Sequence, residues 1–108
     1  MKKLQDSLAD FGRFSEPALL ILISLADGPK HGYAMTRDIE DVSGHKLGPG
    51  TLYGAISRLE TRKWIEPLPA EDRRRPYRLT GAGQRVLKQR LDTLRAMTRV
   101  GVSRLADA

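Results

Sequence analysis

Apolar residues recur at helical spacing through the first half of the chain and predict four short helices. The first is expected over residues 4 to 14, and the second runs from an N-cap at Ser15 to about Ala26. This second segment is apolar on nearly all sides, which is typical of a central helix covered by its neighbours. Two more are expected from Gly32 to Ser43, stopped by Gly44, and from Pro49 onward. Their inward residues are Met35, Ile39 and Val42 in the former, and Leu52, Ile56 and Leu59 in the latter.

The pattern changes after Lys63. Short branched or aromatic segments at residues 64 to 68 and 76 to 79, each bounded by proline, predict two edge strands. The residues between them, 69 to 75, read as an exposed loop that ends in three arginines. Thr80 is expected to cap a long final helix that reaches about Leu105.

The order of these elements predicts a mainly α fold with a two-stranded wing. Three helices followed by a hairpin form a winged helix-turn-helix, in which the third helix enters the DNA major groove. We therefore expect residues 1–79 to form a DNA-binding domain with an additional N-terminal helix. Residues 80–108 would form a C-terminal dimerisation helix.

Charge is distributed unevenly along the 108 residues. The chain has 19 Lys and Arg against 13 Asp and Glu, a formal charge of +6, and the last 36 residues hold ten of the basic residues but only two acidic ones. This asymmetry favours a polyanionic partner, with a merely solvated face as the alternative. The longest apolar run, residues 18 to 23, is too short for a membrane span. With a polar N-terminus and no cysteine, these features predict a cytoplasmic protein without disulfides.

The helix that begins at Pro49 has an outer face suited to DNA. Its small residues would let the helix approach base edges, its N-terminus offers N–H groups to a phosphate, and Arg58 can reach backbone or base. The wing adds basic residues for phosphate contacts, whereas Tyr77 can either touch the DNA backbone or plug the hairpin onto the core. The outer helix residues are Gly50, Thr51, Gly54 and Ser57, and the wing arginines are Arg73, Arg74, Arg75 and Arg78. The competing interpretations are an ordinary amphipathic helix and a solvated loop.

Three groups of residues together resemble a known family. They are His31-Gly32-Tyr33, then Gly48-Pro49-Gly50-Thr51-Leu52-Tyr53 with Arg58-Leu59-Glu60, and then Arg73 to Thr80 followed by Gly83. Over about residues 16 to 90 they resemble PadR-type transcriptional regulators, of the smaller subfamily with a single C-terminal helix. The resemblance implies a homodimeric winged-helix repressor of a pseudo-palindromic operator, often released by a small aromatic effector. By position, it implies DNA contacts from Thr51, Tyr53, Ser57, Arg58 and the three consecutive arginines, with Tyr33 near the DNA backbone.

Two positions depart from the family pattern. Lys63 and Asp72 stand where members commonly have glycine, before the first wing strand and before the arginines. Because glycine adopts backbone conformations that other residues avoid, the shape of the wing depends on how these two residues are accommodated.

The final helix carries an apolar stripe too long for one small domain to cover, which predicts a dimer contact. The residues expected in it are Leu87, Leu91, Leu94, Met97 and Thr98, joined by Leu4, Leu8 and Phe11 of the N-terminal helix. The arginines of this helix would flank the contact as a solvated face. By resemblance to the family, Ala96, Met97 and Val100 are candidates to line an effector cavity, although Met and Leu at helical spacing belong to a core more often than to a ligand site.

No residue pattern indicates catalysis or a bound metal. His31 and His45 are 14 positions apart with no carboxylate at ligand spacing, so we expect no enzyme activity, no metal and no cofactor. Two other functions stay open. One is a winged-helix module that docks an acidic protein, and the other is a membrane-surface binder, although the apolar faces suit packing better.

Overall fold

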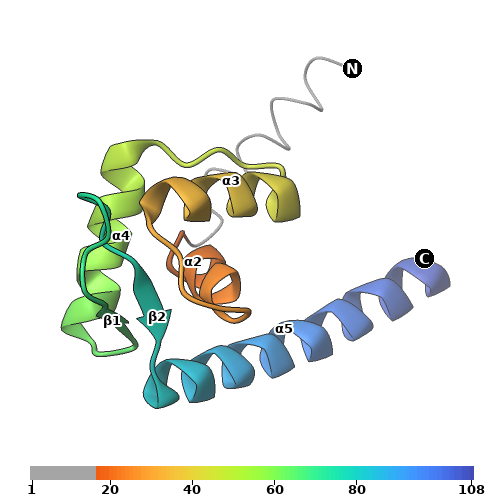
Figure 1. Ribbon diagram of the computed structural model, residues 1–108. Helices are drawn as coiled ribbons and strands as arrows, with labels where there is room; N and C mark the ends of the chain where they lie inside the picture. Colours follow the sequence, from red (N-terminus) through yellow and green to blue (C-terminus); the bar gives the residue numbers. More distant parts are fainter. Residues whose placement is uncertain (1–16) are drawn as a thin grey trace.

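The computed structural model describes residues 17–108 and shows three helices, a two-stranded wing and one long helix (Figure 1). The helices before the wing are α2 (Pro17–Leu25), α3 (Gly32–Ser43) and α4 (Pro49–Thr61). The wing consists of β1 (Ile65–Pro67) and β2 (Tyr77–Leu79), and α5 (Gly81–Asp107) completes the chain. The mainly α winged fold is therefore confirmed. The expected helix over residues 4 to 14, with Leu4, Leu8, Phe11 and Phe14, lies outside the described residues.

The hydrophobic core is centred on α2. Helices α3, α4 and α5 and strand β2 all contact it, as its apolar sequence predicts. The buried apolar residues are Ile21, Leu22, Leu25, Met35, Ile39, Leu52, Ala55, Ile56, Leu59, Ile65 and Leu87. One inward prediction is wrong, because the Val42 side chain is 62% exposed. Val42 stands in the last turn of α3, just before Gly44 ends the helix in a left-handed conformation with φ 77°. Within residues 17–108, the neighbouring elements leave its side chain in solvent.

The wing is a two-stranded antiparallel sheet fastened to the body of the protein. Ile65 pairs with Leu79, Glu66 with Arg78 and Pro67 with Tyr77. The loop before α3 extends this pairing, since Lys30 and Tyr77 exchange two backbone hydrogen bonds of 3.0 and 3.1 Å. Ile65 is buried while Arg78 faces out, so the sheet has one face on the core and one in solvent.

Helix α5 begins against the body and leaves it as an arm (Figure 1). Thr80 caps the helix as predicted, and its hydroxyl accepts a hydrogen bond from the Gly83 N–H at 3.0 Å. Gly83 and Leu87 are its only buried residues, so the first two turns belong to the core. The 27 residues of the helix span about 40 Å at 1.5 Å per residue. The division of the chain at residues 79 and 80 stays a prediction.

Candidate nucleic-acid interface

Helix α4 presents a polar outer face of small residues. Leu52, Ile56 and Leu59 hold its inner face in the core, which turns the opposite side to solvent. The outer side carries Gly50, Thr51, Ser57 and Arg58, all exposed, and the half-buried Gly54. Gly48 is the N-cap and offers no side chain to the first turn, so backbone N–H groups of that turn lack a side-chain partner. These residues share one face, as the sequence predicts.

Two tyrosines stand where α3 and α4 meet. Tyr33 is 64% exposed and Tyr53 is 56% exposed. The Tyr53 phenol lies across the start of α3, because a Cβ added to Gly32 would stand 2.6 Å from its hydroxyl oxygen. The small size of Gly32 therefore allows Tyr53 to link the two helices.

Both positions that depart from glycine adopt left-handed backbone conformations. Lys63 has φ 62°, and the hydrogen bonds around it end α4 in a Schellman motif: its N–H donates to the Glu60 carbonyl at 2.9 Å, and the Trp64 N–H donates to the Leu59 carbonyl at 3.1 Å. Lys63 thus occupies the position at which glycine is favoured. The chain keeps the turn and bears the conformational cost.

The tip of the wing is a tight turn that also uses left-handed backbone conformations. Asp72 and Arg73 have φ 48° and 70°, and the flanking residues Glu71 and Arg74 exchange backbone hydrogen bonds of 2.7 and 2.8 Å. Two central residues with positive φ define a type I′ turn, which fits the right-handed twist of a hairpin. Asp72 therefore does not disrupt the wing. It places a carboxylate beside the arginines.

The arginines of the wing differ in their partners, although all four are exposed. Arg78 forms an ion pair with Glu66, its neighbour across the sheet. Arg75 donates from Nη1 to the Leu68 carbonyl at 2.8 Å. At the end of α4, Arg62 stacks on Trp64, with its guanidinium carbon 5.0 Å from the ring centroid. Sequence spacing predicted none of these pairings, because they depend on the register of the two strands and on the path of the loop.

Tyr77 packs on the core side of the wing. Its side chain is half-buried against the core, and its backbone pairs with Lys30. Burial raises the pKa of the Tyr77 phenol by penalising the phenolate, the Glu60 carboxylate raises it further, and the nearby Arg75 charge acts in the opposite direction. Trp64 is likewise half-buried against the core. These positions agree with one of the two interpretations of Tyr77, in which its side chain packs the hairpin onto the core.

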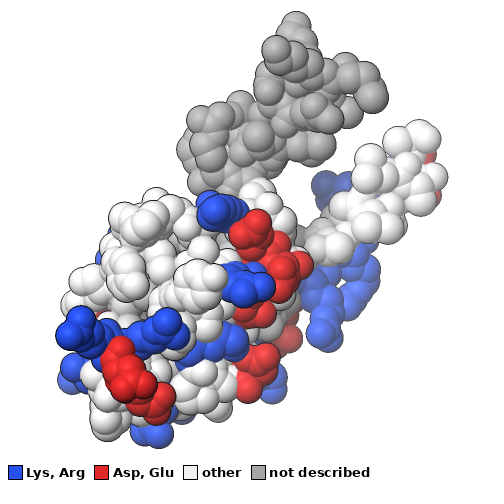
Figure 2. Space-filling view, turned by 45° about the horizontal axis from the view of Figure 1, so that its top comes forward, with Lys and Arg blue, Asp and Glu red and all other residues white. Residues whose placement is uncertain are grey.

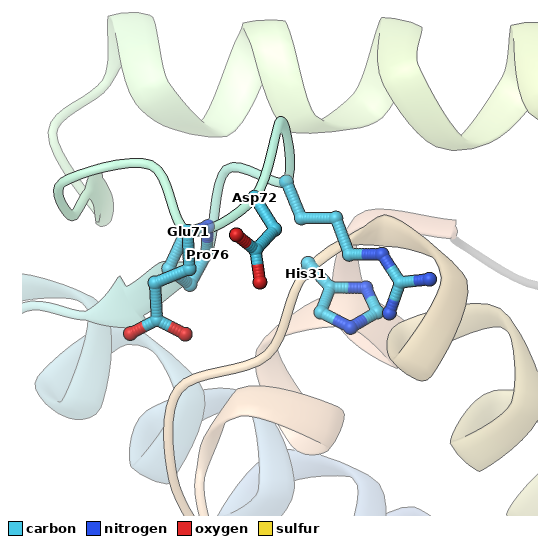
Figure 3. Close-up of a pocket in the computed structure, with 5 residues that line it drawn as sticks. His31, Glu71, Asp72 and Pro76 are labelled. Carbon is cyan, nitrogen blue, oxygen red and sulfur yellow. The ribbon is translucent and has the colours of Figure 1, made fainter.

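A polar cavity lies between the wing turn and the start of α3 (Figure 3). It measures about 360 Å³ and is lined by His31, Glu71, Asp72, Arg74 and Pro76. In Figure 3 the Asp72 carboxylate points toward the His31 side of this cavity and that of Glu71 points away. His31 is the N-cap of α3 and its side chain caps no N–H. Within residues 17–108, no cluster of three or more His, Cys, Asp or Glu could hold a metal ion.

The outer part of the α5 arm keeps apolar side chains in solvent. Leu91 is 39% exposed, Met97 63% and Val100 48%, while Leu94 is half-buried and Thr98 exposed. The sequence predicts Leu87 in the dimer contact, but this residue is only 5% exposed and packs in the core of its own chain. Ala96, Met97 and Val100 line a shallow depression together with Gly101 and Arg104.

Lys and Arg side chains are spread over the body and along the arm, with Asp and Glu side chains among those of the body (Figure 2). The wing lies beside α4 on the same side of the body (Figure 1). Among residues 17–108, no helix has the length and apolar character that a membrane crossing requires.

Comparison with known proteins finds one family. Residues 21–89 match the model of the transcriptional regulator PadR-like family. An uncharacterized 37.1 kDa protein in transposon TN4556 of Streptomyces fradiae is 51% identical over 77 residues, which are 71% of this chain but only 22% of that relative. This chain therefore spans about a fifth of the length of that protein.

Solved structures share the same architecture. A transcriptional regulator from Clostridium thermocellum superposes with a TM-score of 0.70 at 29% identity, covering 77% of this chain and 86% of its own. A PadR family transcriptional regulator from Eggerthella lenta superposes with a TM-score of 0.74 at 26% identity, covering 99% and 96%. The similarity to the latter extends along nearly all of both chains.

Proposed function

The chain belongs to the PadR-like family of transcriptional regulators, and from that premise we propose that it is a homodimeric repressor of a pseudo-palindromic DNA operator. Members of this family are regulators of transcription and not enzymes. One observation carries the proposal: the outer face of α4 is small, polar and exposed, and the wing, whose arginines are exposed, lies beside this helix. We expect a protein that acts on chromosomal DNA in this way to work in the cytoplasm.

We assign base recognition to α4. Gly50, Thr51, Gly54 and Ser57 are small enough to bring the helix close to base edges, and Arg58 supplies the side chain most often used for specific contact with guanine. Tyr53 and Tyr33, exposed at the junction with α3, are placed to touch the sugar-phosphate backbone. Backbone N–H groups at the start of α4 offer a further phosphate contact.

We assign phosphate contacts to the wing. Arg73 and Arg74 at the tip are exposed, and each phosphate that they neutralise would release condensed counterions. Arg75, Arg78 and Tyr77, which the sequence also suggests as contacts, already have partners within the protein. Their contribution to DNA binding is therefore expected to be smaller than that of the tip.

Dimerisation and release are assigned to the arm. Leu91, Leu94, Met97 and Thr98 would meet a second copy, since a stripe of exposed apolar residues on an isolated helix favours association. The depression lined by Ala96, Met97 and Val100 would then face its symmetry mate and form a cavity for a small aromatic effector. With half-sites bound by the two winged domains, their centres should lie about 10 base pairs, or a multiple, apart.

A gel-shift on the promoter of the protein's own transcription unit tests the proposal. The wild-type protein should shift this DNA at low salt and in the presence of random competitor DNA. Arg58→Ala should weaken operator binding about 10-fold or more while leaving binding to random DNA nearly unchanged. Arg99→Ala, an exposed arginine of the arm, is the matched control and should bind both as the wild type does. If the wild type shifts no DNA but binds an acidic protein, the winged domain is an interaction module.

A further inference from the structure

The arginines of the wing do not have equivalent surroundings. Arg75 donates a hydrogen bond from Nη1 to the carbonyl of Leu68 at 2.8 Å, seven positions back in the chain. Leu68 also donates its own N–H to the Pro76 carbonyl at 2.8 Å. Both peptide groups of this residue are therefore engaged by the returning segment, and the loop from 68 to 76 is closed at its base.

The hydrogen bond to Leu68 holds the Arg75 guanidinium at the base of the wing loop. In keeping with this position, the Arg75 charge opposes the rise that burial causes in the pKa of the Tyr77 phenol. Tyr77 is itself fixed to the body by two backbone hydrogen bonds to Lys30. Arg75 thus connects the loop to the part of the wing that the core holds in place.

The tip of the wing contrasts with its base. Within residues 17–108, the side chains of Arg73 and Arg74 make no hydrogen bond or ion pair with the rest of the protein. Arg73 occupies the type I′ turn itself, and Arg74 follows it. A guanidinium without an internal partner can bind a phosphate without first giving up a protein contact.

We propose that Arg75 is a positioning residue for DNA binding: it ties the base of the wing loop through Leu68 so that Arg73 and Arg74, and not Arg75 itself, contact phosphate. This inference rests on the proposed function, because it assigns roles within the same interface. Three adjacent arginines would thus have two roles: Arg73 and Arg74 bind phosphate, and Arg75 fixes the loop that carries them.

Salt dependence distinguishes the two roles. Each phosphate contact contributes about 0.9 to the slope of the logarithm of the binding constant against the logarithm of salt concentration. Arg74→Ala should therefore lower the slope by about 0.9, whereas Arg75→Ala should leave it unchanged. Loss of the loop contact should still weaken binding about fivefold, as expected for one hydrogen bond of about 1 kcal/mol.

The experiment combines DNA titrations with a measurement on the free protein. Fluorescence anisotropy with a labelled DNA duplex, at four salt concentrations, gives the slope for the wild type, Arg74→Ala and Arg75→Ala. In the same proteins without DNA, the carbonyl ¹³C resonance of Leu68 reports its hydrogen bond. It should move in Arg75→Ala and stay in place in Arg74→Ala.

Two results would overturn the inference. One is a slope that falls in Arg75→Ala as much as in Arg74→Ala, since Arg75 would then be a phosphate contact. The other is a Leu68 carbonyl resonance that does not move in Arg75→Ala. The hydrogen bond would then be absent in solution and could not fix the loop. Failure of the wild type to bind any DNA would instead contradict the proposed function, and the Leu68 measurement would still decide where Arg75 lies.

Discussion

Single residues decide how closely the elements of this fold approach one another. Gly83 shows this most clearly, because a Cβ at this position would stand 2.0 Å from the Trp64 carbonyl oxygen and 2.8 Å from Leu79 Cδ1. Leu79 ends β2 and Trp64 directly precedes β1, and the Trp64 carbonyl already accepts a hydrogen bond from the Thr80 N–H at 3.0 Å. Any larger residue must push α5 away from the wing.

We therefore expect Gly83→Ala to lower the free energy of unfolding by about 1–3 kcal/mol, the usual cost of overpacking. This loss would occur although alanine is favoured over glycine within helices by about 1 kcal/mol. Gly54→Ala, inside α4, is the matched control, because a Cβ there would meet only Arg58 Nη1, at an ordinary contact distance of 3.6 Å. Urea denaturation should show equal or greater stability for Gly54→Ala. An unchanged midpoint for Gly83→Ala would show that α5 does not pack so closely.

Tyr77 gives a pH dependence at the same scale. Burial raises its pKa in the folded protein, so the unfolded chain loses the phenolic proton first. The contribution of Tyr77 to the free energy of unfolding is therefore fully present below the ordinary tyrosine pKa near 10. It is lost as the pH rises above that value. Tyr77→Phe should therefore lose less stability between pH 9 and 11 than the wild type, measured by urea denaturation. Identical pH dependence of stability for Tyr77→Phe and the wild type would contradict the assignment.

At the scale of elements, the junction between α4 and β1 carries a conformational cost. Lys63 holds φ 62° so that the Schellman motif can turn the chain into the wing. Lys63→Gly should raise the free energy of unfolding by about 0.5–1 kcal/mol, because relief of left-handed strain exceeds the entropy that glycine loses on folding. Lys88→Gly makes the same exchange inside α5, where it should cost about 1 kcal/mol. If thermal denaturation shows that both variants are less stable than the wild type by the same amount, Lys63 bears no strain.

The helices can be predicted from the helical period of their apolar residues and from the residues that cap or stop them. Gly44, Thr80 and the inward residues Leu52, Ile56 and Leu59 are predicted correctly, because a cap, a stop and a helical period are local properties. Val42 and Leu87 are placed wrongly because exposure at the end of a period depends on which neighbouring element reaches that turn. The tethering of Arg75 and the stacking of Arg62 on Trp64 depend on the three-dimensional path of the wing.

At the scale of the whole molecule, the arm of α5 keeps apolar side chains exposed among residues 17–108. The buried residues of the helix, Gly83 and Leu87, lie in its first two turns, and exposed apolar side chains continue beyond them. The net charge of +6 divides in the same way, with arginines both at the wing and along the arm. Thus much of the basic excess need not touch DNA. It would keep an association helix in solution.

Leu91→Asp tests the dimer contact, since it would place an unpaired charge among apolar side chains. The variant should be monomeric by light scattering at concentrations where the wild type is a dimer, with a dissociation constant raised at least about 100-fold. Val42→Asp, at an exposed apolar position on α3, is the control and should remain dimeric. A Leu91→Asp protein that stays dimeric would move the interface away from this part of the arm.

The central claim is that α4 and the wing read a specific DNA sequence, and selection of binding sites from a random double-stranded library tests it most directly. We expect enrichment of one pseudo-palindromic sequence whose half-sites are separated by about 10 base pairs or a multiple of that distance. Arg58→Ala should lose the preference within each half-site, whereas Arg74→Ala should enrich the same sequence with lower affinity. No enrichment by the wild-type protein at low salt would contradict the account.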